Sequence, residues 1–218
     1  MNNIISNQVY RYLVDLYDNY FLEELRIKAE KESIPIIKKE SESILITLLK
    51  IAKPKNILEL GTAVGFSTML LRKYSNAKIT SIELSKDNYM KAIENISKYD
   101  EIENYNLINE DAKKALKNLD QGFDFVFIDC DKSHYKEYFN LADKLISKGA
   151  IIVCDNVLFK GYVADDDIID RRMITIVKRL REFLAYITNL KNYSTTIIPI
   201  GDGLSVSVKS SGNKSSKT

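Results

Sequence analysis

The sequence predicts an α/β domain with a mostly parallel sheet, helices on both faces of that sheet and an N-terminal helical extension. Three observations support this prediction. After residue 53, short runs rich in β-branched and aromatic residues alternate with helical stretches, which is typical of parallel sheets. The first 52 residues show helical periodicity alone. The 218-residue chain is 45% hydrophobic and 28% charged, which suits a globular domain with a full core.

The N-terminal extension, residues 1–52, is predicted to hold two helical segments. Apolar residues recur every three or four positions from Val9 to Ala29, as they do on one face of a helix. Pro35 interrupts this pattern. A second helical segment covers Glu40 to Ile51, and Pro54 ends it.

The core, residues 53–209, alternates strands with helices. The strand-like runs are Asn56–Leu60, Lys78–Glu83, Tyr105–Asn109, Phe123–Asp129 and Ala150–Cys154. The helical stretches are Phe66–Tyr74, Lys86–Tyr99, Ala112–Leu119 and Tyr135–Ile146, and a long one follows at about Ile168–Leu190. Such repeats make the strands parallel, so their carboxyl ends share one edge of the sheet.

Two further strand-like runs predict an antiparallel hairpin at the edge of the sheet. Ser194–Ile200 and Leu204–Val208 are separated only by Gly201-Asp202-Gly203. Residues 1–209 then form a single domain, and the Ser/Lys-rich residues 210–218 form a disordered tail.

Composition narrows the class of protein. A net charge of +2 neither requires nor forbids a nucleic-acid partner. No apolar run reaches the ~18 residues of a membrane span, and Met1–Tyr10 shows no secretion signal, so no membrane association is expected. Cys130 and Cys154 are too few for a disulfide framework, so we expect a cytoplasmic protein.

Glycines follow the first predicted strand, at the end where open parallel sheets bind ligands. Gly61 and Gly65 lie in the segment that joins Glu59 at the strand end to the next helix. Glycine at this point lets a ligand approach the backbone. Dinucleotide-binding proteins need G-x-G-x-x-G, whereas this spacing is G-x-x-x-G, and the Gly-Lys-Ser/Thr of a phosphate-binding loop is missing. The pattern therefore disfavours NAD, FAD and a phosphate-binding loop.

Acidic residues follow the second and third predicted strands. Glu83 lies about 20 residues beyond the first strand, where a carboxylate accepts hydrogen bonds from ribose hydroxyls. Asp111 and Ala112 follow the third strand and are placed to meet an adenine ring. Predicted contacts to a ribose and an adenine, without a phosphate-binding motif, point to S-adenosylmethionine as the cofactor. The alternative is that the glycines only make a turn and the carboxylates only cap helices.

Oxygen ligands follow the fourth and fifth predicted strands. Asp129 ends the fourth strand, and Asp155 and Asn156 end the fifth, so the three can converge on one ion. Hard oxygen ligands favour Mg²⁺, Mn²⁺ or Ca²⁺ over zinc. The alternative interpretation makes Asp129 and Asp131 helix caps and Asp155-Asn156 a plain turn.

Three motifs resemble one family in their order and spacing. They are Ile57-Leu58-Glu59-Leu60-Gly61-Thr62, Ile128-Asp129-Cys130-Asp131-Lys132 and Asp155-Asn156-Val157-Leu158. From about Leu22 to Val208, the chain resembles the metal-dependent class I O-methyltransferases, which include catechol and caffeoyl-CoA O-methyltransferases. Ile34-Pro35-Ile36, the run from Asp155 to Gly161 and the run from Gly201 to Ser205 look most like the bacterial branch that methylates 5-hydroxyuridine at the tRNA wobble position.

The resemblance implies a Rossmann-like, seven-stranded sheet with a reversed last strand, and members of this family are commonly homodimers. It implies metal ligation by Asp129, Asp155 and Asn156, and it places Lys132 as the candidate catalytic base. Together with the residues that follow the third strand, the predicted cofactor-binding residues are Ile37, Glu59, Gly61, Ser67, Glu83, Asp111, Ala112 and Asp129.

One departure from the family bears on the substrate. The catechol enzyme has a Glu after its Asp-Gly-Leu, where it holds a substrate hydroxyl, whereas this chain has Ser205. A free catechol is therefore less favoured. In 5-hydroxyuridine the 5-hydroxyl lies beside the 4-carbonyl, and this pair of oxygens can chelate an ion as a catechol does. The first hypothesis is therefore methylation of 5-hydroxyuridine in the tRNA anticodon stem-loop.

Two alternatives stay open. One is O-methylation of a small catechol-like or phenolic metabolite, and the other is a non-catalytic module that binds S-adenosylmethionine. A tRNA substrate needs phosphate contacts. The candidates, which would equally suit a solvated basic face, are Lys160, Arg171, Arg172, Lys178, Arg179 and Arg181.

Overall fold

The computed structural model describes residues 6–16, 20–120, 122–165 and 171–211. Residues 212–218 of the predicted tail and residues 168–170 of the predicted long helix lie outside this part. Among the helices it contains, none is both long and apolar enough to cross a membrane.

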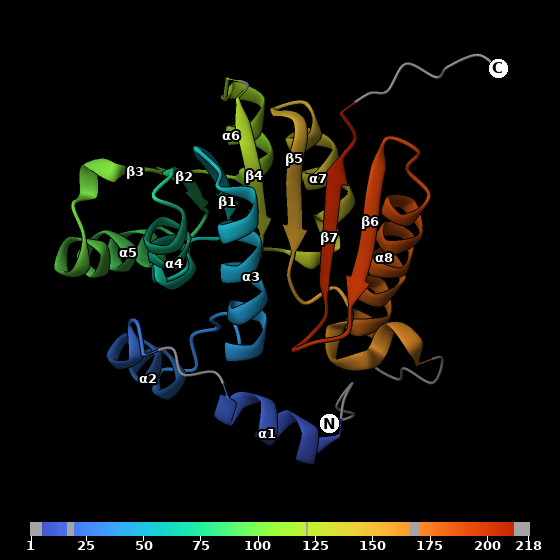
Figure 1. Ribbon diagram of the computed structural model, residues 1–218, viewed down its shortest axis with the longest axis horizontal. Coiled ribbons are helices and arrows are strands. Elements are labelled where there is room, and N and C mark those ends of the chain that lie inside the picture. The colour runs from blue at the N-terminus through green and yellow to red at the C-terminus, as the bar shows by residue number, and fades with distance from the viewer. Residues whose placement is uncertain (1–5, 17–19, 121, 166–170, 212–218) are drawn as a thin grey trace.

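The strands form one mixed, seven-stranded sheet (Figure 1). The parallel strands are β1 (Asn56–Leu60), β2 (Lys78–Glu83), β3 (Tyr105–Asn109), β4 (Phe123–Ile128) and β5 (Ile146–Cys154). β6 (Tyr193–Ile198) and β7 (Leu204–Lys209) form an antiparallel hairpin, and β7 also pairs antiparallel with β5. The order is β3-β2-β1-β4-β5-β7-β6, which confirms the predicted Rossmann-like sheet with a reversed last strand.

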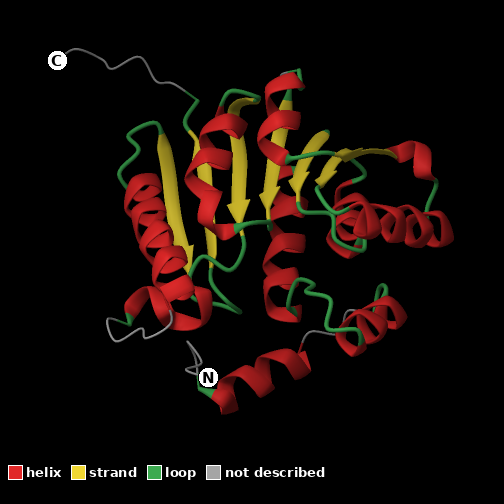
Figure 2. Cartoon of the chain, turned by 180° about the vertical axis from the view of Figure 1, so that it is seen from behind, coloured by secondary structure: helices red, strands yellow, loops and turns green. Residues whose placement is uncertain are grey.

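Helices cover both faces of the sheet, as the front view of Figure 1 and the rear view of Figure 2 show. One face carries α3 (Lys39–Ala52), α4 (Phe66–Ser75) and α5 (Lys86–Tyr99). The other carries α6 (Ala112–Asn118), α7 (Tyr135–Asp143) and α8 (Arg171–Thr188). Short 3-10 helices are η1 (Ile102–Asn104), η2 (Lys132–His134) and η3 (Phe159–Ala164). Since β4 is buried on both faces, with Phe125 and Phe127 in one core and Val126 and Ile128 in the other, its sequence is almost continuously apolar.

The sequence predicts one helical stretch from Val9 to Ala29 in the N-terminal extension, and this prediction is wrong. The structure has two helices, α1 (Asn7–Leu16) and α2 (Glu23–Lys31). Leu22 adopts a φ of 60° immediately before α2, a left-handed conformation that breaks the helix. This break brings Leu22 and Ala29 into the core, while α1 keeps apolar side chains exposed. The periodic pattern runs across the break, so it could not reveal the change of direction.

The end of α7 and the start of β5 also differ from their predicted positions. The cause is pairing with a strand that is distant in the sequence. The helical pattern predicts α7 up to Ile146 and the next strand only from Ala150, whereas α7 ends at Asp143 and β5 begins at Ile146. Ile146 is the parallel partner of Phe123 in β4. Ile146 therefore joins the sheet through this pairing, although the sequence around it has no strand pattern; the register then shifts, and the next paired residue of β5 is Ile151, opposite Phe125.

A buried arginine anchors the N-terminal extension to the core. Arg26 of α2 donates a 3.0 Å hydrogen bond to the carbonyl oxygen of Ile37 and forms a buried ion pair with Glu42 of α3. Its guanidinium carbon also lies 4.5 Å from the centre of the Phe66 ring at the start of α4. These contacts fix the segment before α3 next to the carboxyl edge of the sheet, which is the lower edge in Figure 1.

Candidate functional site

The carboxyl edge of the sheet contains a fully buried carboxylate, Glu59, at the end of β1. The hydroxyls of Thr68 and Ser81 donate to its Oε2 atom at 2.5 and 2.6 Å. Its Oε1 atom is buried and has no hydrogen-bond partner among the described residues. Burial raises the pKa of Glu59 to about 7, although the neighbouring hydroxyls oppose that rise. An orphaned acceptor of this kind suits a ligand that brings its own donor.

Gly61 begins the loop after β1, and it can only be glycine. Its φ is +101°, and a Cβ atom built on it would lie 2.1 Å from the carbonyl oxygen of Asp129. The chain is held this close because Gly61 donates to Ile82 and Asp129 donates to Leu60, both at 2.9 Å and both through backbone amides. Gly61 thus lets the loop after β1 lie directly against the end of β4.

Glu83 at the end of β2 is fixed by backbone amides. Its Oε2 atom accepts a hydrogen bond from Ala63 and its Oε1 atom accepts one from Ser85, each at 2.8 Å. Each carboxylate oxygen keeps a second lone pair, so both can still accept a hydroxyl donor. Glu83 is therefore held beside the Gly61 loop, as a ribose acceptor would need to be.

The other predicted cofactor residues surround this edge. Ser67 is buried in the first turn of α4, and Ile37 is buried just before α3. Asp111 caps α6 by accepting a 3.1 Å hydrogen bond from the Lys114 amide, so the capping interpretation holds for that residue. Ala112 begins α6 and is half-buried against the core.

The predicted metal ligands follow two adjacent parallel strands. Asp129 comes after β4 and Asp155 after β5, and the last residues of these strands are register partners. The Asp155 amide donates to the Ile128 carbonyl at 3.0 Å, and the Asn156 amide donates to Asp155 Oδ1 at 2.6 Å. Asn156 has a φ of 55°, in the left-handed region. The structure thus brings Asp129 and Asp155 close enough to interact, and Asn156 is the next residue of the chain after Asp155.

Two of these ligands form a buried pair of like charges. Burial raises the pKa of both Asp129 and Asp155, and the negative charge of Asp129 raises the pKa of Asp155 further. The Lys132 ammonium lies 4.0 Å from Asp129 Oδ1 and lowers the pKa of both carboxyls. A single lysine therefore faces two carboxylates, which leaves the cluster short of positive charge.

This donor set fits a hard divalent cation. Carboxylate and amide oxygens are its preferred ligands, and its charge would relieve the repulsion between Asp129 and Asp155. In the described part of the chain, no three His, Cys, Asp or Glu side chains are grouped closely enough to hold a metal. The fit therefore depends on Asn156 as the third protein ligand.

Two features of the site were not predicted from the sequence. Thr68 and Ser81 complete the environment of Glu59, and no sequence signal marks them, because their elements α4 and β2 contain several other polar residues. Asp202 is only a turn residue by its sequence context. In the structure its charge lies near enough to Asp155 to raise the pKa of that carboxyl.

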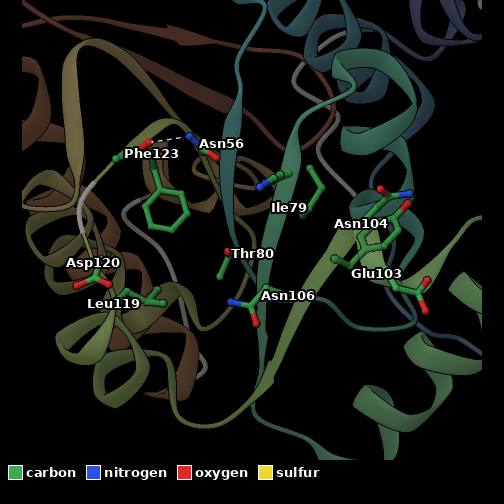
Figure 3. A pocket seen from close by; sticks show the side chains of 12 residues that line it. Asn56, Ile79, Thr80, Glu103, Asn104, Asn106, Leu119, Asp120 and Phe123 are labelled. Carbon is green, nitrogen blue, oxygen red and sulfur yellow. Dashed lines mark hydrogen bonds between the residues drawn. The ribbon is translucent and has the colours of Figure 1, made fainter.

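A separate pocket lies at the opposite, amino edge of the sheet (Figure 3). It measures about 450 Å³ and contains none of the predicted site residues. Asn56, Thr80, Asn106 and Phe123 line it, from the first residues of their strands. This pocket is therefore not part of the candidate site.

Three comparisons with known proteins agree with this geometry. A family model described as O-methyltransferase matches residues 14–210. A catechol O-methyltransferase from Niastella koreensis is 32% identical over 177 residues, which cover 77% of this chain and 80% of that protein. A caffeoyl-CoA O-methyltransferase from Populus kitakamiensis is 30% identical over 203 residues, which cover 85% and 84%. The crystal structure of an O-methyltransferase from Bacillus cereus in complex with S-adenosylhomocysteine is similar with a TM-score of 0.80 and 28% identity, and the match covers 93% of this chain and 97% of that one.

Proposed function

Because this chain belongs to the O-methyltransferase family and is an S-adenosylmethionine-dependent O-methyltransferase, we propose that its acceptor is 5-hydroxyuridine at the tRNA wobble position. The product would be 5-methoxyuridine. The observation that supports an ion-bound hydroxyl is the buried pair Asp129 and Asp155, beside Asn156 and Lys132, and Ser205 in place of a carboxylate favours the uridine over a free catechol. Such a site suits a hydroxyl next to a second oxygen, because both oxygens can share one ion.

In the proposed reaction the methyl group passes from the sulfonium sulfur to the acceptor oxygen, and the hydroxyl loses its proton. When bound by Asp129, Asp155 and Asn156, a magnesium ion, or manganese or calcium, would lower the pKa of the acceptor hydroxyl. Lys132, whose Nζ atom lies 4.0 Å from Asp129 Oδ1, is the candidate base and would have to be a neutral amine to take the released proton. Glu83 would accept the ribose hydroxyls of the cofactor, and Glu59 Oε1 offers an unused acceptor.

A basic hollow beside the site supports an RNA acceptor. It measures about 580 Å³ and begins at Ser133 and His134, directly after Lys132. Phosphates of an RNA strand that enters the site would meet the cations in this hollow. Two carboxylates, Glu137 and Glu182, also line it; Glu137 pairs with Lys113 at 2.7 Å, and Arg179 donates to the Ser133 carbonyl at 3.3 Å. The cations that line it are Lys113, Lys136, Lys144 and Arg179.

The basic residues named from the sequence divide into three groups. Lys160, Lys178 and Arg179 are exposed. Arg181 donates to the carbonyls of Val163 and Asp165 at 2.8 and 2.7 Å, so it binds the segment after η3 instead of a phosphate. The side chains of Arg171 and Arg172 lie outside the described part of the structure.

A small catechol-like or phenolic acceptor is the second candidate. The relatives that favour it are a catechol O-methyltransferase at 32% identity and a caffeoyl-CoA O-methyltransferase at 30%. The same carboxylate pair would serve this acceptor. Against it stands Ser205, which supplies no carboxylate where the catechol enzyme is expected to hold a hydroxyl.

The two candidates can be separated with the purified protein, Mg²⁺ and labelled S-adenosylmethionine. One acceptor is tRNA that carries unmethylated 5-hydroxyuridine, and the others are catechol and caffeic acid. We expect 5-methoxyuridine by mass spectrometry of the digested tRNA. Turnover of the small phenols with unchanged tRNA would reject the first candidate in favour of the second.

A matched pair of charge reversals tests the basic hollow. Arg179→Glu should lower methylation of tRNA by about tenfold without changing S-adenosylmethionine affinity, because it removes a phosphate contact. Lys191→Glu, an exposed change before β6, is the control and should leave the rate unchanged. Equal rates of tRNA methylation for both variants would show that the hollow does not bind the RNA.

A further inference from the structure

The turn between β6 and β7 is fastened to the loop that carries Asn156. We call residues 155–160 the ion loop. Its Val157 and Leu158 amides donate to the carbonyls of Gly203 and Asp202, each at 2.9 Å. A Cβ atom on Gly203 would lie 2.3 Å from Leu158 Cγ, so the two segments are in tight contact.

The same turn also touches the first turn of α3. Figure 1 shows the turn reaching toward the end of α3 at the carboxyl edge of the sheet. A Cβ atom on Gly201 would lie 2.4 Å from the Ser41 hydroxyl oxygen, and it would also approach Glu40. The turn is therefore wedged between the ion loop and the segment that contains Ile37, which places it between the two halves of the candidate site.

Asp202, at the centre of this turn, holds the ion loop through its side chain as well. Its carboxylate is 13% exposed, and Oδ1 accepts a 2.8 Å hydrogen bond from the Lys160 amide. The ammonium of Lys38 lies 3.9 Å from the same atom. A carboxylate that accepts a backbone amide in a half-closed environment makes a strong, directional contact.

The ion loop needs such support because its backbone is strained. Asn156, Phe159 and Lys160 have φ values of 55°, 46° and 56°, so three residues that are not glycine adopt the left-handed region. Each costs free energy and persists only where neighbouring contacts enforce it. The hydrogen bond to Asp202 enforces this conformation at Lys160, the last residue of the loop.

We propose that Asp202 is a positioning residue, which holds the ion loop through the Lys160 amide and thereby sets the affinity of the Asp129, Asp155 and Asn156 site for its divalent cation. This inference rests on the ion site of the proposed function. Asp202 acts by accepting a hydrogen bond and not through its charge. The amide of an asparagine should therefore replace it, whereas alanine should not.

The test measures Mn²⁺ binding to the full chain by calorimetry, without cofactor or acceptor. Asp202→Ala should weaken binding by about tenfold or more, because the loop that carries Asp155 and Asn156 loses a contact, whereas Asp202→Asn should stay within about threefold of the wild type. Asp124→Ala is the matched control, because Asp124 also accepts backbone amides, from Lys55 and Asn56, but at the amino edge. It should leave Mn²⁺ binding unchanged.

A second readout needs no metal. Amide hydrogen exchange at Lys160 should be faster in Asp202→Ala by about tenfold or more and close to the wild type in Asp202→Asn. Equal loss of Mn²⁺ binding in both Asp202 variants would mean that the charge matters and would overturn the positioning role. Unchanged binding in both, or an equal loss in Asp124→Ala, would also overturn it. A wild-type chain that binds no Mn²⁺ would instead reject the ion site itself.

Discussion

Asp124 and Asp100 near the amino edge of the sheet are satisfied by neighbouring groups, whereas at the carboxyl edge burial raises the pKa of Glu59 and Asp155. At the amino edge, Asp124 accepts hydrogen bonds from the Lys55 and Asn56 amides at 3.0 and 2.8 Å. Near the start of β3, Asp100 accepts a 2.6 Å hydrogen bond from the Tyr105 hydroxyl, and its pKa is lowered by its hydrogen bonds although burial opposes this. At the carboxyl edge, Glu59 keeps an orphaned oxygen and Asp155 has a raised pKa.

This difference separates carboxylates that support the fold from carboxylates that await a ligand. A buried charge without a partner lowers stability, so a chain keeps one only where a bound group compensates it. The pocket at the amino edge measures about 450 Å³, but the carboxylates that line it, Glu103 and Asp120, are exposed to solvent and not buried. Function therefore follows the unsatisfied charge and not the volume of a pocket. Variants at the two edges should accordingly fail in different ways.

The largest effect is expected for Asp155→Asn. Removal of one ligand should lower metal-dependent methyl transfer by about a thousandfold or more, and Mn²⁺ binding should be lost with it. The free energy of unfolding without metal should stay the same or increase, because a buried charge is removed. Methyl transfer and urea unfolding measure the two quantities. Retained activity above a tenth of the wild-type rate would contradict the ion site.

A pair of glycine substitutions compares the two edges directly. Gly61→Ala at the carboxyl edge forces a Cβ atom to 2.1 Å from the Asp129 carbonyl, whereas Gly122→Ala at the amino edge meets nothing within 4 Å. Both positions have a positive φ, so both variants are strained by about 1–3 kcal/mol. Gly61→Ala should cost about 2 kcal/mol more, because the overlap is with backbone. Equal losses in urea unfolding would mean that the loop moves aside freely.

The pH dependence of stability offers a third comparison, through Glu59. Its pKa is raised from 4.5 to about 7 in the folded state. The folded chain therefore binds more protons than the unfolded chain between these values, and the free energy of unfolding falls as the pH rises through this window. Above it, the loss from this group is complete and amounts to about 3 kcal/mol at most.

Glu59→Gln should remove this contribution. Relative to the wild type, the free energy of unfolding of the variant should rise by up to about 3 kcal/mol between about pH 5 and pH 8. Urea unfolding of both proteins without cofactor gives the difference, in which the titrations of Asp129 and Asp155 cancel to first order. Parallel pH profiles would show that Glu59 does not titrate in this range.

A smaller effect, confined to the cofactor, is expected for Glu83→Ala. The variant loses the carboxylate that accepts the Ala63 and Ser85 amides and that, as we propose, would accept the ribose hydroxyls of the cofactor. S-adenosylmethionine affinity should fall by about tenfold to a hundredfold, which corresponds to about one charge-assisted hydrogen bond. Mn²⁺ affinity should change by less than about threefold, since Glu83 lies on β2 and not beside the ion loop. An equal loss of affinity for S-adenosylmethionine and Mn²⁺ would contradict the assignment of the cofactor and the ion to separate sites.

The same contrast explains what the sequence could predict. A recognisable strand leads to each of Glu83, Asp129 and Asp155. Because parallel strands end at one edge of a sheet, local patterns predict that these residues share that edge. Asp202 belongs to a hairpin that pairs with β5 through residues some 50 positions away, and no local pattern reveals that contact. The break before α2 was missed for a related reason, because Leu22 turns the chain without glycine or proline.

The smallest effect, and the sharpest check of the contrast, is expected for Asp124→Ala. Asp124 is a carboxylate at a strand end, like Asp155, but its oxygens are already occupied by backbone amides. Its removal leaves those amides to water, because they lie near the surface, so the free energy of unfolding should fall by only about 1–2 kcal/mol. Methyl transfer and both ligand affinities should match the wild type. If Asp124→Ala lowered Mn²⁺ affinity as Asp155→Asn does, the ion affinity would depend on overall stability, and an unsatisfied carboxylate would no longer mark the site.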